Sequence, residues 1–175
     1  LISNVVITGT TLSNNSGTAP VNPAYTFFTG QPNYTADLQA GSSYNVQVTI
    51  GSFAGQGVAV WIDYNDDGVF TTPDERVGFT PGQITSAFGT GIFPIVLDCD
   101  PPLGQHRMRV RLNWNMAGGL IDPCASYAYG ETEDYVVNIT TADPCPAPFA
   151  LSASNATTTS ADLSWTAGCV ETLWD

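Results

Sequence analysis

The sequence predicts an all-β fold: an antiparallel, jelly-roll-like β-sandwich, with an incomplete second β-module at the C-terminus. Strand-like runs recur along the chain, and clear helical periodicity is missing. Turn signals rich in Gly, Pro, Asn and Ser separate these runs. Charged residues make up only 11% of the 175 residues, whereas Gly occurs 17 times and Pro 12 times. Short strands joined by such turns are typical of a sandwich.

Six runs are expected to form strands of the first module: 5–11, 44–50, 58–62, 92–97, 106–114 and 135–140. Two of them alternate cleanly between apolar and polar residues. The predicted inward-facing residues are Tyr44, Val46, Val48 and Ile50 in one run, and Met108, Val110, Leu112 and Trp114 in the other. Because successive side chains of a strand point to opposite faces, these sets predict the core between two sheets.

A proline-rich break divides the chain. We expect a β-sandwich over 1–141 and a linker over 142–148, where prolines favour an extended connector. Residues 149–175 resemble the first strands of a fibronectin type III module, which needs about 100 residues to close. Two strands cannot bury a core alone. This tail is therefore either cut short or packed on something else, such as a neighbouring copy. We expect the chain to be a fragment of a longer or processed protein.

One acidic loop carries the clearest chemical signal. Residues 63–75 read DYNDDGVFTTPDE and place Asp63, Asn65 and Asp67 at positions 1, 3 and 5, with Gly68 at position 6. This spacing directs three oxygen-bearing side chains at one centre, and the glycine permits the sharp turn. Calcium is the expected cofactor because it prefers six to eight oxygen ligands. The alternative is a solvated acidic turn.

Further oxygens would be needed to complete a calcium shell. We expect the backbone carbonyl of Val69 and the carboxylate of Glu75 to contribute, and Glu133 to approach from another strand. Glu75 falls at position 13, whereas a helix-flanked calcium loop has its glutamate at position 12. The residues before this loop read as a strand, so the flanking helices of that motif are not expected.

Three segments resemble the signature blocks of one protein family. Residues 61–70, 107–111 and 129–135 are similar to those of the GEVED domain, with Thr132 in place of the family's valine. The resemblance spans roughly residues 1–141. It implies a β-sandwich accessory module with a calcium site, in secreted multi-module proteins of Bacteroidetes-type bacteria. It names no ligand.

Composition excludes several functions. The chain has 16 acidic and four basic residues and a formal net charge of −12, so nucleic acid is not an expected partner. No apolar run approaches the roughly 18 residues of a membrane span, so membrane insertion is not expected. The single histidine, His106, has no nucleophile at a recognisable spacing. We therefore expect no catalysis.

Arginine and aromatic residues offer two weaker sites. Arg107, Arg109 and Arg111 share one face of a predicted strand, where they either clamp carboxylated or sulfated glycans or pair internally with acids of 131–134. The internal pairing is favoured because the fold is rich in carboxylates. A sugar-stacking platform would use four aromatic residues: Trp61, Trp114, Tyr127 and Tyr129. Packing inside the fold is the favoured alternative.

The four cysteines are expected to form disulfides, as in exported proteins. Locality favours pairing Cys99 with Cys124 and Cys145 with Cys169, because each pair closes a short loop within one module.

These expectations combine into a non-catalytic structural or adhesive module, secreted to the bacterial surface and stabilised by calcium. Self-assembly through exposed strands would make other copies its partners. The alternative is a carbohydrate-binding accessory module that targets a larger enzyme or adhesin to extracellular polysaccharide.

Overall fold

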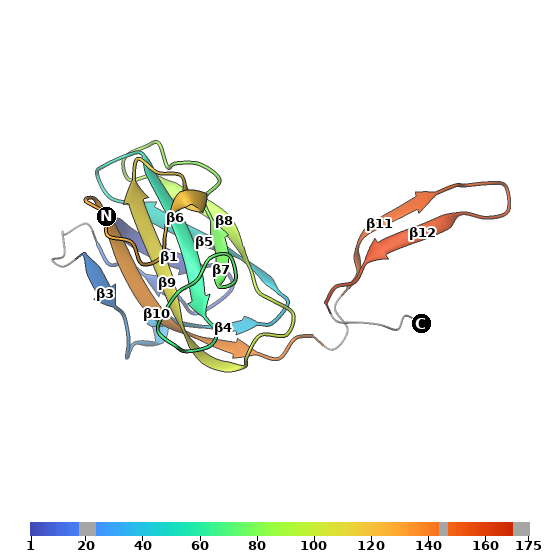
Figure 1. Ribbon diagram of the computed structural model, residues 1–175, viewed down its shortest axis with the longest axis horizontal. Helices are drawn as coiled ribbons and strands as arrows, with labels where there is room; N and C mark the ends of the chain where they lie inside the picture. Colours follow the sequence, from blue (N-terminus) through green and yellow to red (C-terminus); the bar gives the residue numbers. More distant parts are fainter. Residues whose placement is uncertain (18–23, 144–146, 170–175) are drawn as a thin grey trace.

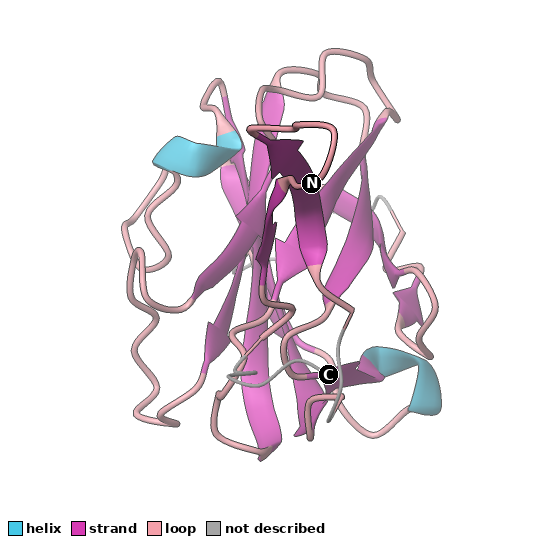
Figure 2. Cartoon of the chain, turned by 90° about the vertical axis from the view of Figure 1, so that its right-hand side faces the viewer, coloured by secondary structure: helices cyan, strands magenta, loops and turns pink. Residues whose placement is uncertain are grey.

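The computed structural model describes residues 1–17, 24–143 and 147–169. Strands account for 48% of the chain and helix for 4%, which confirms the predicted all-β class. Two sheets pack face to face, and two short 3-10 turns, η1 (Pro32–Tyr34) and η2 (Gly118–Leu120), lie at opposite ends of the sandwich (Figure 2). No helix in the described part of the chain is long and apolar enough to cross a membrane.

The first sheet has four strands in the order β2-β1-β5-β8. They are β1 (Ile2–Ile7), β2 (Ser13–Asn14), β5 (Ser43–Ile50) and β8 (Thr90–Val96). All of its neighbouring strands run antiparallel.

The second sheet has the order β3-β10-β9-β6-β7, and β4 also pairs with β10. Its strands are β3 (Tyr25–Phe27), β4 (Thr35–Gln39), β6 (Gln56–Asp63), β7 (Arg76–Phe79), β9 (Gly104–Trp114) and β10 (Gly130–Thr140). Both β3 and β4 run parallel to β10, so this edge departs from the predicted antiparallel arrangement. The reason is geometric: two short segments each cover one half of the long strand β10.

The core lies between the inner faces of the two sheets. The predicted alternation is confirmed for most positions of β5 and β9, where Val46, Val48, Ile50, Met108, Val110 and Leu112 are buried. Trp114 differs, because it is the last residue of β9 and is 48% exposed. Its ring meets Tyr129 edge to face at 5.6 Å between centroids.

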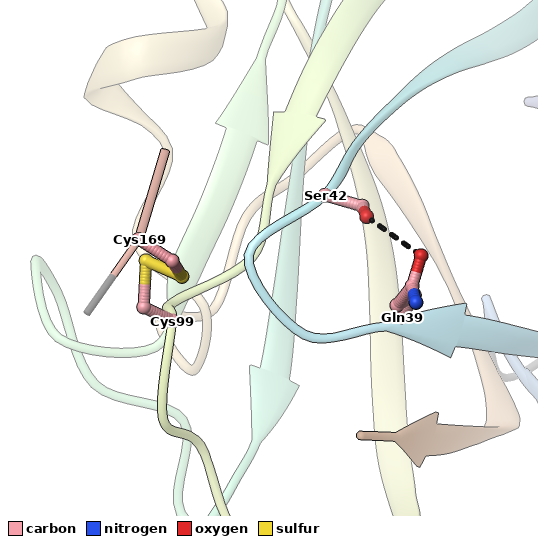
Figure 3. Close-up of a disulfide and its surroundings, with 4 residues drawn as sticks. All are labelled: Gln39, Ser42, Cys99 and Cys169. Atoms are coloured by element: carbon pink, nitrogen blue, oxygen red, sulfur yellow. Dashed lines mark hydrogen bonds between the residues drawn. A yellow bond between two sulfur atoms is a disulfide. The ribbon is translucent and has the colours of Figure 1, made fainter. Parts of the chain in front are cut away.

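A separate hairpin of β11 (Phe149–Ser154) and β12 (Asp162–Thr166) projects from the sandwich (Figure 1). The chain then returns to the sandwich, where Cys169 forms a disulfide with Cys99 (Figure 3). The predicted pairing by locality is therefore wrong. Cys124 is exposed and free, with its sulfur 3.9 Å from the Phe70 carbonyl oxygen. Cys145 lies outside the described residues.

Candidate functional site

The acidic loop 63–75 leaves the second sheet at the end of β6, a strand in which every residue is buried. Trp61 is fully buried on the outer face of this strand and packs with Ala59, Phe70 and Ile121. Its indole N–H donates to the Thr72 hydroxyl at 3.0 Å, which ties the sheet to the loop above it. A sugar cannot stack on a ring with no exposed surface, so the predicted ligand-binding role of Trp61 is wrong.

The first half of the loop is folded by its own carboxylate and amide oxygens. Asp63 Oδ2 accepts the Gly68 N–H at 3.0 Å, and Asn65 Oδ1 accepts the Asp67 N–H at 3.0 Å. Asp67 Oδ1 in turn accepts the Val69 N–H at 2.7 Å. Gly68 has a positive φ of 80°, a conformation that glycine adopts without strain. The three side chains predicted as ligands are thus gathered around one turn.

One carboxylate oxygen of this turn is left without a partner. Asp63 is 3% exposed, and its Oδ1 is buried with no hydrogen bond. Asp63 also lines a cavity of about 290 Å³ together with Asp66, His106 and Arg107. Burying an unsatisfied carboxylate oxygen is costly, so such an atom calls for a cation or another donor.

The oxygen donors of this turn are of the kinds that a hard cation prefers, although few of them are carboxylates. No three His, Cys, Asp or Glu side chains gather into a metal-binding group anywhere in residues 1–17, 24–143 and 147–169. The predicted set does not depend on such a group, because Asn65 supplies an amide oxygen and Val69 a backbone carbonyl. Oxygen ligands of these kinds are the ones that calcium takes beside carboxylates. The contribution of the Val69 carbonyl stays a prediction.

Glu75 closes the loop by accepting hydrogen bonds. Its Oε1 accepts the Tyr64 N–H at 3.2 Å, and its Oε2 accepts the N–H and hydroxyl of Thr71 at 2.8 and 3.1 Å. The side chain is 5% exposed. Both oxygens are therefore engaged with the loop itself, and Glu75 acts here as a clamp between the two ends of the turn.

Glu133 does not lie at the loop. The register pairs Glu133 with Val110 and Val110 with Val60, whereas Asp63 pairs with Arg107. Glu133 is on the inner face of the sheet, 1% exposed, where its Oε2 accepts the Tyr135 hydroxyl at 2.6 Å. Asp63 and Trp61 occupy the outer face. Glu133 therefore lies on the opposite face of the sheet from Asp63, so it cannot join the ligand set that was predicted to include it.

Burial makes Glu133 a proton-binding group near neutral pH. Desolvation raises its pKa from 4.5 to about 7, and the negative charge of Glu131 adds to this. The hydrogen bond from the Tyr135 hydroxyl acts in the opposite direction. The folded state consequently binds this proton more tightly than the unfolded state does.

The free energy of unfolding should fall as pH rises from about 4.5 to about 7, because a group with a raised pKa contributes stability only while it is protonated. Over the full window this contribution amounts to about 3 kcal/mol. Glu133→Gln keeps an acceptor for Tyr135 and carries no charge, so the variant should lose this slope and gain stability above pH 7. Urea unfolding at pH 5 to 8 checks it, and parallel slopes for both proteins would contradict it.

The central arginine of the stripe, Arg109, pairs internally with an acid of 131–134, as the favoured alternative predicted. Arg109 forms a two-point ion pair with Asp134, with Nε–Oδ1 at 2.8 Å and Nη2–Oδ2 at 2.9 Å. Asp134 is fully buried and also accepts the Tyr25 hydroxyl at 3.0 Å. Burial acts to lower the pKa of Arg109, but the hydrogen bonds and charge of Asp134 outweigh it and raise that pKa. Arg109 is therefore a structural residue.

Arg111 is also used internally. It donates to the backbone carbonyls of Asp122 and Ala125 and so holds the loop that follows η2. Arg107 remains exposed and lies over the ring of Phe27 at 4.8 Å. In all, three arginines of β9 stack on three aromatic rings, since Arg109 lies over Phe70 and Arg111 over Tyr127. The absence of lysine is the sequence signal for this arrangement, because guanidinium stacks on rings better than an ammonium does.

Comparison with known proteins adds a domain assignment. No curated protein matches the chain. Among solved structures, the crystal structure of a class 5 fimbriae chaperone, CfaA, is similar at 15% identity with a TM-score of 0.36, covering 77% of this chain. The alignment spans 65% of that chaperone, slightly less than two thirds of its length. Residues 57–138, which include the acidic loop, the arginine stripe and the segment 129–135, match the GEVED domain.

Proposed function

We propose that this chain is a non-catalytic structural or adhesive module of an extracellular bacterial protein, and that a calcium ion held by the loop 63–75 stabilises it. The observation that carries this proposal is the buried, unpartnered Oδ1 of Asp63. It belongs to a turn that also gathers Asn65 and Asp67. A bound cation would supply the positively charged partner that this oxygen lacks.

Calcium would act on stability through the folded loop. The unfolded chain has no preformed site, so binding adds to the free energy of unfolding in proportion to the logarithm of calcium concentration over affinity. Extracellular modules bind calcium with dissociation constants of about 10⁻⁴ to 10⁻³ M. Because β6 ends at Asp63 and lies between β9 and the edge strand β7, ordering this loop secures the end of a strand that is paired on both sides.

An extracellular location is supported by the disulfide and by the surface charge. Disulfides such as Cys99–Cys169 form and persist in oxidising compartments. At a net charge of −12, the acidic side chains repel one another across a small fold, and bound calcium would offset part of that repulsion.

The non-catalytic part of the proposal rests on how the reactive side chains are used. His106 is 4% exposed, and its ring nitrogens contact Asp66 Oδ1 at 3.2 Å and the Pro102 carbonyl oxygen at 3.0 Å. Among the described residues neither ring nitrogen contacts a hydroxyl or thiol nucleophile, whereas a general base holds its nucleophile within hydrogen-bond reach. Arg109, at the centre of the arginine stripe, is committed to its ion pair with Asp134.

Assembly with other copies is the finer part of the proposal. The hairpin β11–β12 exposes apolar residues on a two-stranded sheet, with Leu151 at 74% and Leu163 at 61% exposure. Two strands alone do not bury a core, so strands added from elsewhere would complete this sheet.

Calcium should raise the melting temperature, and Asp63→Asn should abolish the effect. At 5 mM calcium and a dissociation constant of about 10⁻⁴ M, the gain is about 2 kcal/mol. For a chain of this size that corresponds to roughly 4 to 8 °C. Differential scanning calorimetry with calcium and with EDTA measures the shift directly.

Asp66→Asn is the matched control, because Asp66 belongs to the same turn but stands at position 4 and is directed at His106. This variant should keep the calcium shift. A melting temperature that does not respond to calcium in the wild-type protein, or an equal response in Asp63→Asn, would contradict the assignment.

A further inference from the structure

The cavity beside the acidic loop extends from the loop over the outer face of the second sheet. Its volume of about 290 Å³ is close to the lower end of the range for small-ligand pockets. Its lining includes three residues of the loop and side chains from β3 and β9, namely Asp63, Asp66, Gly68, Phe27, Gln105 and Arg107. This hollow therefore joins the proposed calcium loop to the exposed end of the arginine stripe.

Arg107 differs from the other arginines of the stripe in having no acceptor for its N–H groups. Arg109 donates to Asp134, and Arg111 donates to two backbone carbonyls. Among the described residues Arg107 forms no hydrogen bond and no ion pair. Its guanidinium lies over the Phe27 ring at 4.8 Å, a contact that holds the group in the cavity lining and leaves its donors available.

Arg107 does not neutralise Asp63, although the two residues are directly opposite each other on β9 and β6. Opposite residues of neighbouring strands have Cβ atoms about 5 Å apart, which is close enough for an ion pair. Asp63 Oδ2 accepts the Gly68 N–H at 3.0 Å, whereas its buried Oδ1 has no hydrogen-bond partner. The same cavity lining thus contains a carboxylate oxygen without a donor and a guanidinium without an acceptor.

The charges of the lining make anion binding depend on a metal ion. Asp63 and Asp66 each carry one negative charge and Arg107 carries one positive charge, so the lining has one negative charge in excess. A calcium ion at Asp63 adds two positive charges and leaves one positive charge in excess. Since a bound cation is often the largest local charge in a site, calcium changes this hollow from one that repels anions to one that attracts them.

From this arrangement we propose that the cavity binds a carboxylate ligand, which bridges the calcium ion of the loop and Arg107. This inference rests on the proposed calcium site. One carboxylate oxygen completes the calcium shell, and the other accepts hydrogen bonds from the guanidinium. The cavity has more room than a carboxyl group needs, and Gln105 adds an exposed amide to its lining, so a sugar acid with hydroxyl groups suits the remaining space.

NMR titration of the chain in 5 mM calcium tests the proposal, with galacturonate, acetate and galactose as probes. Galacturonate and galactose share a sugar ring, and only galacturonate carries a carboxylate. Both carboxylates should shift the amide signals of Gly68, Gln105 and Arg107 saturably, whereas galactose should not. In EDTA the affinity for galacturonate should fall at least tenfold. Tighter binding of galacturonate than of acetate would assign the ligand to sugar acids, and equal affinities would assign it to simple organic acids.

Three variants make the result specific to Arg107. Arg107→Met removes the charge and should weaken galacturonate binding at least tenfold, while the calcium-induced rise in melting temperature stays intact. Arg107→Lys keeps a positive charge without the planar fork and should bind more tightly than Arg107→Met. Gln83→Glu is the charge-matched control, because it also makes the chain more acidic by one charge. It lies at the opposite end of β6, where Gln56 pairs with Ile84, and should bind like wild type.

Four outcomes would overturn the proposal in a chain whose melting temperature calcium raises. They are a failure of galacturonate to bind, equal binding of galactose, undiminished binding in EDTA, and binding by Arg107→Met that equals wild type. A melting temperature that does not respond to calcium is a distinguishable result, since it contradicts the calcium site itself and removes the bridging ligand together with it.

Discussion

Asp134→Asn is expected to lower the free energy of unfolding by about 3 kcal/mol. Asp134 is fully buried and holds Arg109 through two hydrogen bonds of 2.8 and 2.9 Å. The substitution leaves the shape of the side chain intact but removes its charge. The Arg109 side chain is only 16% exposed, so its positive charge would stay in a poorly solvated place without a counter-ion. Breaking buried pairs in this way typically costs 3 to 5 kcal/mol.

Asp37→Asn provides the matched control. Asp37 is an exposed carboxylate on β4, also next to β10, and accepts a hydrogen bond from Asn138 at 2.7 Å. Its replacement should change stability by no more than about 0.5 kcal/mol. Urea unfolding of both variants makes the comparison. Equal losses would mean that the Arg109–Asp134 pair is no more important than a surface contact.

The double variant Arg109→Met with Asp134→Val distinguishes the cost of leaving one charge unpaired from the net contribution of the ion pair itself. Apolar residues of similar size often replace a buried ion pair at little or no net cost. We therefore expect the double variant to be more stable than Asp134→Asn alone. A loss equal to the sum of the two single losses would show that the two residues act independently.

The regular part of the fold follows from local pattern. The runs at 44–50 and 106–114 could be identified because their apolar residues alternate, and β5 and β9 bury most of those residues in the structure. The strands β2, β3 and β7 were missed because each has only two to four residues, too few for any period to emerge. The parallel edge formed by β3 and β4 was missed because pairing partners distant in sequence leave no local trace.

The part of the candidate site that is local in sequence was likewise predictable, and the part that depends on distant strands was not. Asp63, Asn65 and Asp67 lie on one turn in the structure because only three residues of chain separate the first from the last. The placement of Glu133 depends on which face of β10 it occupies, and a shift of one residue in a strand reverses that face. Trp61 could not be distinguished from an exposed ring because burial on the outer face of β6 comes from the loop folding over it.

Cys169→Ser is expected to lower the free energy of unfolding by about 4 kcal/mol. The Cys99–Cys169 bond joins residues that are 70 positions apart. In the chain-entropy account, closing a loop of this length restricts the unfolded chain by that amount. The loop contains β9 and β10, the two strands with the most extensive pairing in the second sheet. The loss should therefore appear in unfolding of the sandwich, not only of the hairpin.

The background for this measurement is Cys124→Ser, which prevents the Cys124 thiol from pairing with a released cysteine. In that background Cys99→Ser and Cys169→Ser should lose the same stability, because each removes the same bond. The pairing predicted from locality leads to a different pattern: Cys124→Ser alone would be strongly destabilising, and Cys169→Ser would affect the hairpin only. Urea unfolding of the three variants under non-reducing conditions thus decides which cysteine holds the loop at Cys99 and whether the segment beyond β12 contributes to the stability of the sandwich.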